Sequence, residues 1–127
     1  MNNLEFRERR RYPRIEKKLP LKISSDEYDI ITQTKNISCI GAYCSVNRSI
    51  PVLTKLSIIL LLPSASKRHP NIKIKCKGVV VRTERDPSGN FNIAIFFNEI
   101  SKNQKDKISK YVNQHLNYGK DRKTSFG

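Results

Sequence analysis

The chain has 127 residues, which is room for one domain with a single core and argues against a two-domain enzyme. Lysine and arginine total 25 against 11 acidic residues, a net charge of +14, so we expect an anionic partner: a nucleotide, a nucleic acid or an anionic membrane surface. The longest apolar run, residues 58–62, is far shorter than the ~20 residues that span a bilayer, and the N-terminus is charged rather than signal-like. We therefore expect a cytoplasmic protein without a membrane span.

Residues 1–18 carry many charges and few apolar anchors, which predicts a flexible basic arm outside the core. Pro13 lacks an N–H and disfavours the α region for Tyr12, so this part of the arm is expected to be extended or turn-like. The arginines of residues 9–14, RRRYPR, suit guanine edges, phosphate oxygens and base stacking. Taken alone, the segment also fits a solvated arm or a loose RNA-binding tail.

From Leu19 onward, period-two alternation broken by turn residues predicts six strands, at residues 19–24, 28–35, 41–46, 54–62, 72–85 and 91–98. Many short strands with no helical segment between them indicate a small antiparallel barrel. In the fifth strand, three lysines alternate with apolar residues, at Lys73, Lys75 and Lys77. This exposed row fits either a solvated face or a surface that follows phosphates.

Residues 36–41, NISCIG, fall between two predicted strands and are expected to form a turn. Asparagine and serine hydrogen-bond locally or to a nearby ligand, and glycine permits a positive φ or a close approach of backbone to ligand. As a single pattern, N-x-S-x-x-G is an ordinary turn.

A helix is predicted after the strands. Ser101 with Gln104 forms a capping box, and an apolar stripe follows on one helical face, at Ile108, Tyr111, Val112 and Leu116. The stripe favours packing on the barrel, and the helix is expected to end near Gly119. Residues 19–118 are then the barrel with its helix, and residues 119–127 a disordered basic tail.

No catalytic or metal-binding constellation stands out. The three cysteines and two histidines lie at no ligand spacing and form no C-x-x-C pair: Cys39, Cys44, Cys76, His69 and His115. We therefore expect no disulfide framework, no metal, no cofactor and no enzymatic activity.

The order of the two polar motifs resembles that of the PilZ domain, the bacterial receptor module for cyclic di-GMP. The matching residues are Arg9, Arg10 and Arg14 of R-R-x-x-x-R, followed by Asn36, Ser38 and Gly41 of N-x-S-x-x-G. Residues 78–82 and 92–97 look like later strands of the family, and residues from Ser101 like its final helix. The resemblance implies a six-stranded antiparallel β-barrel with a C-terminal helix that binds cyclic di-GMP on its outer wall.

The resemblance also implies roles. Arg10 and Arg14 would grip guanine and phosphate, Asn36 and Ser38 would hydrogen-bond to the ligand, and Gly41 would keep the turn open.

Two further arginines and two departures follow from the same resemblance. Arg9, just before R-x-x-x-R, is associated in the family with a stacked ligand dimer, so two ligand molecules per chain are expected, and Arg82 is a further candidate phosphate contact. Asn36 stands where aspartate is common, and Ala94 where glycine is frequent. We expect the neutral amide of Asn36 to weaken binding rather than abolish it.

The expected function is a signalling receptor whose arm is ordered by cyclic di-GMP, which changes the surface shown to a downstream protein partner that the sequence does not name. One alternative is a small basic barrel that binds nucleic acid, although Phe91 and Phe97 share a strand face with Ile93 and Ile95, which favours core over stacking. Another is a PilZ-like adaptor that has lost the ligand and works through protein contacts.

Overall fold

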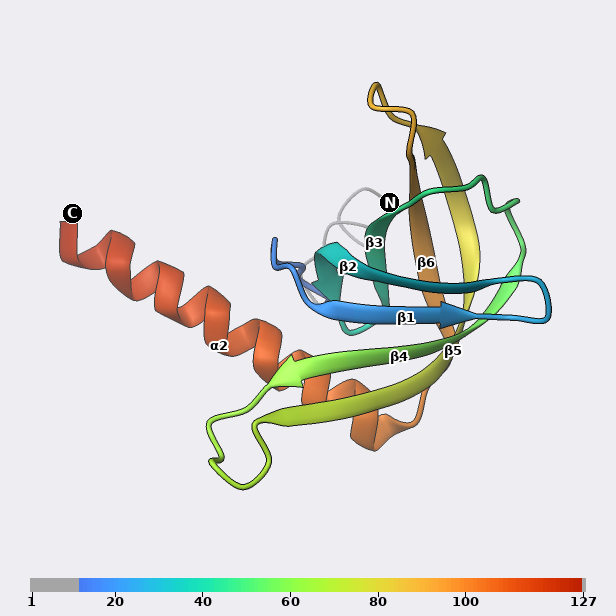
Figure 1. The fold of residues 1–127 in the computed structure, drawn as a ribbon. Coiled ribbons are helices and arrows are strands. Elements are labelled where there is room, and N and C mark those ends of the chain that lie inside the picture. The colour runs from blue at the N-terminus through green and yellow to red at the C-terminus, as the bar shows by residue number, and fades with distance from the viewer. Residues whose placement is uncertain (1–11, 127) are drawn as a thin grey trace, which may run out of the picture.

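The computed structural model describes residues 12–126, with side chains up to Leu116. Six strands and one helix follow along the chain: β1 (Pro20–Ser24), β2 (Asp29–Ser38), β3 (Gly41–Val46), β4 (Lys55–Pro63), β5 (Asn71–Arg85), β6 (Phe91–Glu99) and α2 (Lys102–Phe126). The strands pair antiparallel and close into a barrel in the order β1-β2-β3-β6-β5-β4 (Figure 1). The predicted fold class is confirmed.

Alternating apolar side chains fill the barrel. All six strands contribute fully buried members: Leu21, Ile23, Ile37, Cys44, Ile58, Leu60, Leu62, Ile74, Val80 and Ile93. Each leucine, isoleucine or valine side chain among them contributes roughly 1.5–3 kcal/mol by leaving water. The alternation predicted for β5 is confirmed, since Ile74 is buried whereas Lys73, Lys75 and Lys77 are exposed.

Strand β2 divides its pairing between two neighbours. Residues 29–33 pair with β1, residues 34–38 pair with β3, and the register shifts by one residue at Lys35. Such a bulge turns a strand locally. The predicted turn at residues 36–41 was wrong in extent, because β2 continues to Ser38 and only Cys39 and Ile40 form the turn. The reason is Ile37, whose fully buried side chain keeps this stretch on the barrel.

The chain before β1 also lies along β2. Ile15 and Ile37 form an antiparallel bridge, and Leu19 N donates to Thr34 Oγ1 over 3.0 Å. Pairing with β2 therefore begins at Ile15, before the predicted boundary of the barrel at Leu19. Residues 1–11 of the predicted arm lie outside the described residues.

Helix α2 begins as predicted, with one difference at its cap. Gln104 N donates to Ser101 Oγ over 3.2 Å, which confirms the N-cap. The Gln104 side chain does not complete the predicted capping box, because its Oε1 accepts a hydrogen bond from Lys75 N of β5 over 2.6 Å. This bond fixes the start of α2 to the barrel.

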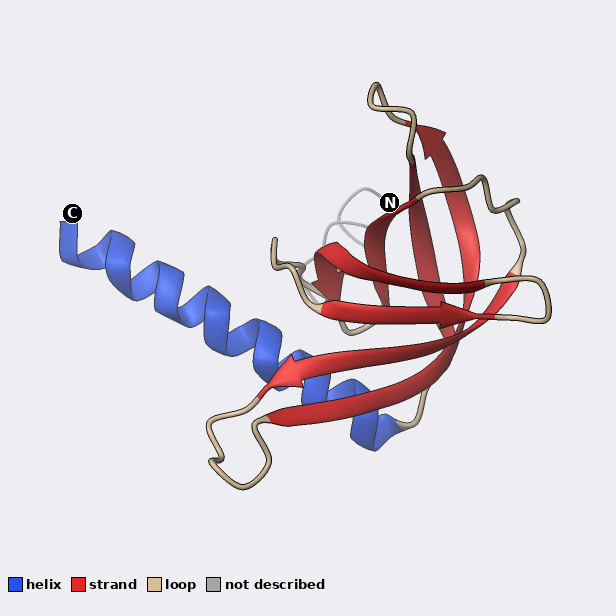
Figure 2. Ribbon diagram, viewed as in Figure 1, coloured by secondary structure: helices blue, strands red, loops and turns tan. Residues whose placement is uncertain are grey.

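The inner face of α2 is the predicted one. Ile108, Tyr111 and Val112 are buried, and Leu116 packs against the same core. The N-terminal half of the helix lies against the barrel, and the rest extends past the strands (Figures 1 and 2). The helix continues to Phe126 instead of ending near Gly119, since an internal glycine costs only about 1 kcal/mol relative to alanine.

No helix among the described residues combines the length and apolar character that a membrane span requires.

Candidate functional site

The bridge between Ile15 and Ile37 brings the two polar motifs together. Arg14 directly precedes Ile15, and Ser38 directly follows Ile37. Because the two segments are antiparallel, Arg14 lies beside Ser38. Both residues line one hollow of about 350 Å³ on the outer wall of the barrel.

Strand pairing arranges the wall of this hollow in two rows. The first row crosses β2, β3, β6 and β5 through Asn36, Tyr43, Ala94 and Arg82. The second row crosses β2, β3 and β6 through Ser38, Gly41 and Phe96. Adjacent strands lie ~4.8 Å apart, so the first row extends ~14 Å from β2 to β5. We call this surface the motif wall.

Every described residue that the sequence predicted for the site lines this hollow: Arg14, Asn36, Ser38, Gly41 and Arg82. Arg9 and Arg10, the other two predicted residues, lie outside the described residues. The hollow is lined by two guanidinium groups and by no carboxylate among the described side chains.

Ser38 shapes the turn at the edge of the motif wall. Its side chain is only 5% exposed, and its Oγ accepts a hydrogen bond from Ile40 N over 3.2 Å. Phe97 N in turn donates to Ile40 O over 2.8 Å, which attaches the turn to β6. The serine thus stabilises the geometry of the hollow.

Gly41 is required by the close approach of β3 to β6. A Cβ at this position would collide with the carbonyl oxygen of Ile95. Its backbone is not left-handed, since Gly89 is the one described glycine with a positive φ. The structure therefore explains this glycine by strand packing rather than by the conformation of the turn.

The lining residues that were not predicted from the sequence include Tyr43, Val81 and Phe96. Val81 and Phe96 are 50% and 43% exposed, which is unusual for large apolar side chains. Tyr43 alternates with the buried residues Ala42 and Cys44, so strand periodicity alone places it on the outer face. An apolar or aromatic residue at an outward-facing strand position was the sequence signal that could have indicated these lining residues.

Arg82 is held at the β5 side of the hollow. Its Nε lies 2.8 Å from Glu84 Oε1, and its Cζ lies 5.6 Å from the centre of the Tyr43 ring. The second contact is within the range of a cation–π interaction.

A second hollow of about 570 Å³ adjoins the first and shares Asn36 and Tyr43 with it. Its other lining residues are Glu16, Lys17, Lys18 and Lys35. Three ammonium groups against one carboxylate leave a net positive charge, which makes this neighbouring space favourable for a further anion.

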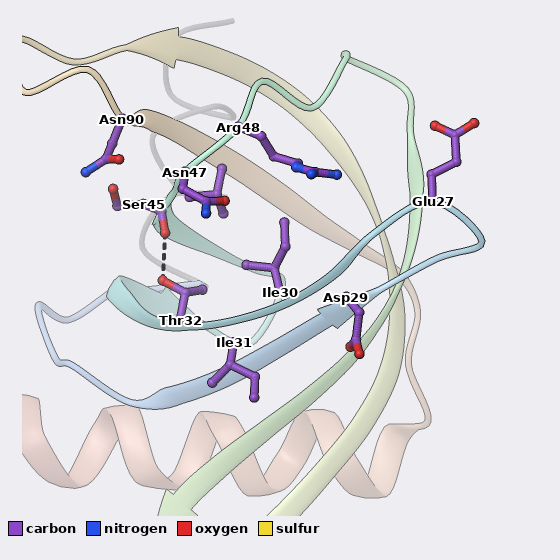
Figure 3. A pocket seen from close by; sticks show the side chains of 10 residues that line it. Glu27, Asp29, Ile30, Ile31, Thr32, Ser45, Asn47, Arg48 and Asn90 are labelled. Carbon is purple, nitrogen blue, oxygen red and sulfur yellow. Dashed lines mark hydrogen bonds between the residues drawn. The ribbon is translucent and has the colours of Figure 1, made fainter.

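A larger hollow, of about 630 Å³, lies at the start of β2. Figure 3 shows Thr32 and Ser45 joined by a hydrogen bond there, with Arg48 on one side and Glu27 at the hairpin. Glu27 and Asp29 both line it, against the single guanidinium of Arg48. Two carboxylates disfavour a dianion, so the motif wall is the better anion site.

The described residues provide neither a metal cluster nor an activated thiol. No group of three or more His, Cys, Asp or Glu side chains in residues 12–116 is arranged to hold a metal ion. Burial raises the pKa of Cys44 to about 12 and that of Cys76 to about 11, so both thiols are protonated at neutral pH.

Known proteins resemble this chain in sequence profile and in fold. The sequence profile of the PilZ domain matches residues 8–114. The structure of the Bacillus subtilis inhibitor of motility, MotI/DgrA, is similar with a TM-score of 0.74 and 27% identity, covering 86% of this chain and 52% of that one. The chain thus spans about half the length of that protein.

A second solved structure, the PilZ domain of YcgR from Escherichia coli with c-di-GMP, has a TM-score of 0.60. The match covers 91% of this chain and 98% of that one at 10% identity, so it shows a shared fold. No curated protein matches the chain.

Proposed function

The chain belongs to the PilZ domain family, and on that basis we propose that it is a receptor for cyclic di-GMP, without enzymatic activity, that acts in the cytoplasm. The observation that carries the proposal is the position of Arg14 beside Ser38, which unites both motifs on the motif wall. A cyclic dinucleotide offers two phosphates and two guanines, and guanidinium groups recognise both.

In this proposal Arg10 and Arg14 grip guanine and phosphate from the β2 side. Asn36 and Ser38 contact the ligand from the barrel, and Arg82 adds a phosphate contact at the β5 side. The ~14 Å width of the wall suits a ligand of dinucleotide size better than a single phosphate.

Two ligand molecules per chain are part of the proposal. Arg9 precedes R-x-x-x-R, and the neighbouring hollow with Lys17, Lys18 and Lys35 adds positive charge beside Asn36. A stacked pair of dianions requires more cations than one molecule does.

The arm offers a route from the ligand to a protein partner. Tyr12 packs against the core, and Lys105 Nζ of α2 lies 4.9 Å from the centre of its ring. A ligand that draws the arginines onto the motif wall would alter this contact, and with it the surface near α2. The YcgR structure contains c-di-GMP and MotI/DgrA inhibits motility, which supports a signalling role for this chain.

The experiment is isothermal titration of the full chain with cyclic di-GMP. We expect saturable binding that is lost in Arg10→Ala and in Arg14→Ala. Lys73→Ala is the control, because it removes an exposed cation of β5 that does not line the hollow. No heat at high ligand concentration would leave the adaptor alternative.

The exposed lysines of β5 favour nucleic acid as a second candidate. Steeply salt-dependent binding to single-stranded DNA or RNA, unaffected by Arg10→Ala and Arg14→Ala, would establish that candidate instead. Ordering of the arm is tested separately by hydrogen exchange of residues 5–18, which should slow when cyclic di-GMP is added.

A further inference from the structure

Arg82 lies across the motif wall from Arg14, with β2, β3 and β6 between them. It ends the row that begins at Asn36, so the hollow has a guanidinium group on each side. The Arg82 side chain is 59% exposed. An exposed arginine ordinarily samples many rotamers, and that freedom must be lost when it binds a ligand.

Two neighbours already restrict Arg82. Glu84 stands two residues further along β5 on the same face, and its Oε1 lies 2.8 Å from Arg82 Nε. Tyr43, two strands away in the same row, places its ring 5.6 Å from Arg82 Cζ. The carboxylate contact is at Nε, which leaves the four N–H donors of the two Nη atoms for another acceptor.

We propose that Glu84 and Tyr43 are positioning residues that hold the Arg82 guanidinium over the motif wall, ready to receive a phosphate of the ligand. This inference rests on the proposed function, because the ligand is the anion proposed above. Glu84 acts through Arg82 and makes no contact with the ligand.

Glu84 has two opposing effects on a dianion. It orders Arg82, and it adds a negative charge near the site. Both side chains are more than half exposed, so the repulsion is screened by water and salt. The ordering of Arg82 by Glu84 therefore outweighs the repulsion between Glu84 and the ligand. Replacing Glu84 with glutamine removes the charge but keeps the hydrogen-bond acceptor, which separates the two effects.

The test compares Glu84→Ala with Glu84→Gln by titration with cyclic di-GMP. Glu84→Ala should weaken binding about threefold to tenfold, the effect of ordering one rotamer-rich side chain. Glu84→Gln should restore binding to within about twofold of the unmodified chain, since its amide oxygen still accepts from Nε. Tyr43→Leu, which keeps an apolar side chain but lacks the ring, should weaken binding as Glu84→Ala does.

A double-mutant cycle separates positioning from general structure. In an Arg82→Ala background, Glu84→Ala should have no further effect on affinity, and Tyr43→Leu, whose ring also lines the hollow, should have a smaller effect than in the unmodified chain. Asp29→Ala is the matched control, because it removes another exposed strand carboxylate that is paired with a cation, Lys22 at 3.9 Å, away from the motif wall. The affinity of Asp29→Ala for cyclic di-GMP should match that of the unmodified chain. The melting temperature of each variant in this series should also match that of the unmodified chain.

The inference is overturned if Glu84→Ala binds as tightly as the unmodified chain, if Glu84→Gln binds as weakly as Glu84→Ala, or if the effect of Glu84→Ala persists without Arg82. Loss of binding in Arg14→Ala together with unchanged binding in Glu84→Ala removes this inference alone. A chain that binds no cyclic di-GMP removes the proposed function and this inference together.

Discussion

Ile15 and Ile37 exchange two backbone hydrogen bonds, Ile15 N to Ile37 O and Ile37 N to Ile15 O, each 3.0 Å long. This pair joins the segment before β1 to the end of β2. The residues next to it, Arg14 and Ser38, belong to the two motifs that are separate in the sequence. This one backbone pairing therefore brings Arg14 of the first motif beside the second motif.

Replacing Ile15 with proline tests that pairing. Ile15→Pro removes the N–H that donates to Ile37 O, and a lost hydrogen bond of this kind should weaken cyclic di-GMP binding about fivefold or more. Titration measures the affinity, and thermal unfolding should show that the barrel persists. Unchanged affinity would mean that the pairing does not position Arg14.

The contact between β3 and β6 predicts different effects at two glycines. Gly41→Ala should lower the free energy of unfolding by about 1–3 kcal/mol, because the new Cβ meets the rigid backbone oxygen of Ile95. Gly78→Ala should cost less, since its two nearest contacts are side-chain atoms, Ile95 Cγ2 at 2.6 Å and Ile58 Cδ1 at 2.8 Å, and its nearest backbone atom, Phe96 O, is 3.1 Å away. Urea denaturation ranks the two variants, and equal costs would contradict the explanation given for Gly41.

Leu53 is the one described non-glycine residue with a positive φ, 76°, and its side chain is 74% exposed. Leu53→Gly should raise the free energy of unfolding by about 1 kcal/mol by relieving backbone strain. Val52→Gly, at a neighbouring exposed position without a positive φ, is the control and should lower it by about 0.5–1 kcal/mol. Urea denaturation of both variants checks the opposite signs.

Burial of Cys44 predicts a loss of stability at high pH. Burial raises the pKa of its thiol from 9.0 to about 12 in the folded chain. Below pH 9.0 the thiol is neutral in both states, so its contribution is intact; as pH rises from there toward about 12, only the unfolded chain gains from ionisation and stability falls. Urea denaturation at about pH 8 and about pH 10 should show a smaller drop for Cys44→Ala than for the unmodified chain. Equal drops would show that another group causes the dependence.

Much of the fold could be predicted from the sequence because alternation of apolar residues is local. Strand β3 matches its predicted residues 41–46, and the buried stripe of α2 contains the predicted Ile108 and Val112. The nucleic-acid stacking platform was disfavoured on the same grounds, and Phe97 is indeed only 4% exposed.

The remainder depends on contacts between distant segments. Asn36 and Ser38 have turn-forming side chains, yet both lie in β2 because Ile37 between them is buried and paired with Ile15. Gln104 completes no capping box because the amide of Lys75 is within reach. Local propensity contains no information about either partner.

The same holds for the contact between Tyr43 and Arg82, which was not predicted. Tyr43 and Arg82 lie on different strands and meet only because both pair with Ala94 of β6. Predicting their contact would have required the order of the strands in the barrel, which places β6 between β3 and β5.

The bridge at Ile15 also limits where the first motif can place its arginines. Chain geometry alone keeps the Cα atom of Arg10 within ~18 Å of that of Ile15, because five residues span at most that distance. Residues inserted between the two positions would enlarge that radius. Ligand affinity should therefore depend on the number of residues between Arg10 and Ile15 as well as on the residues themselves.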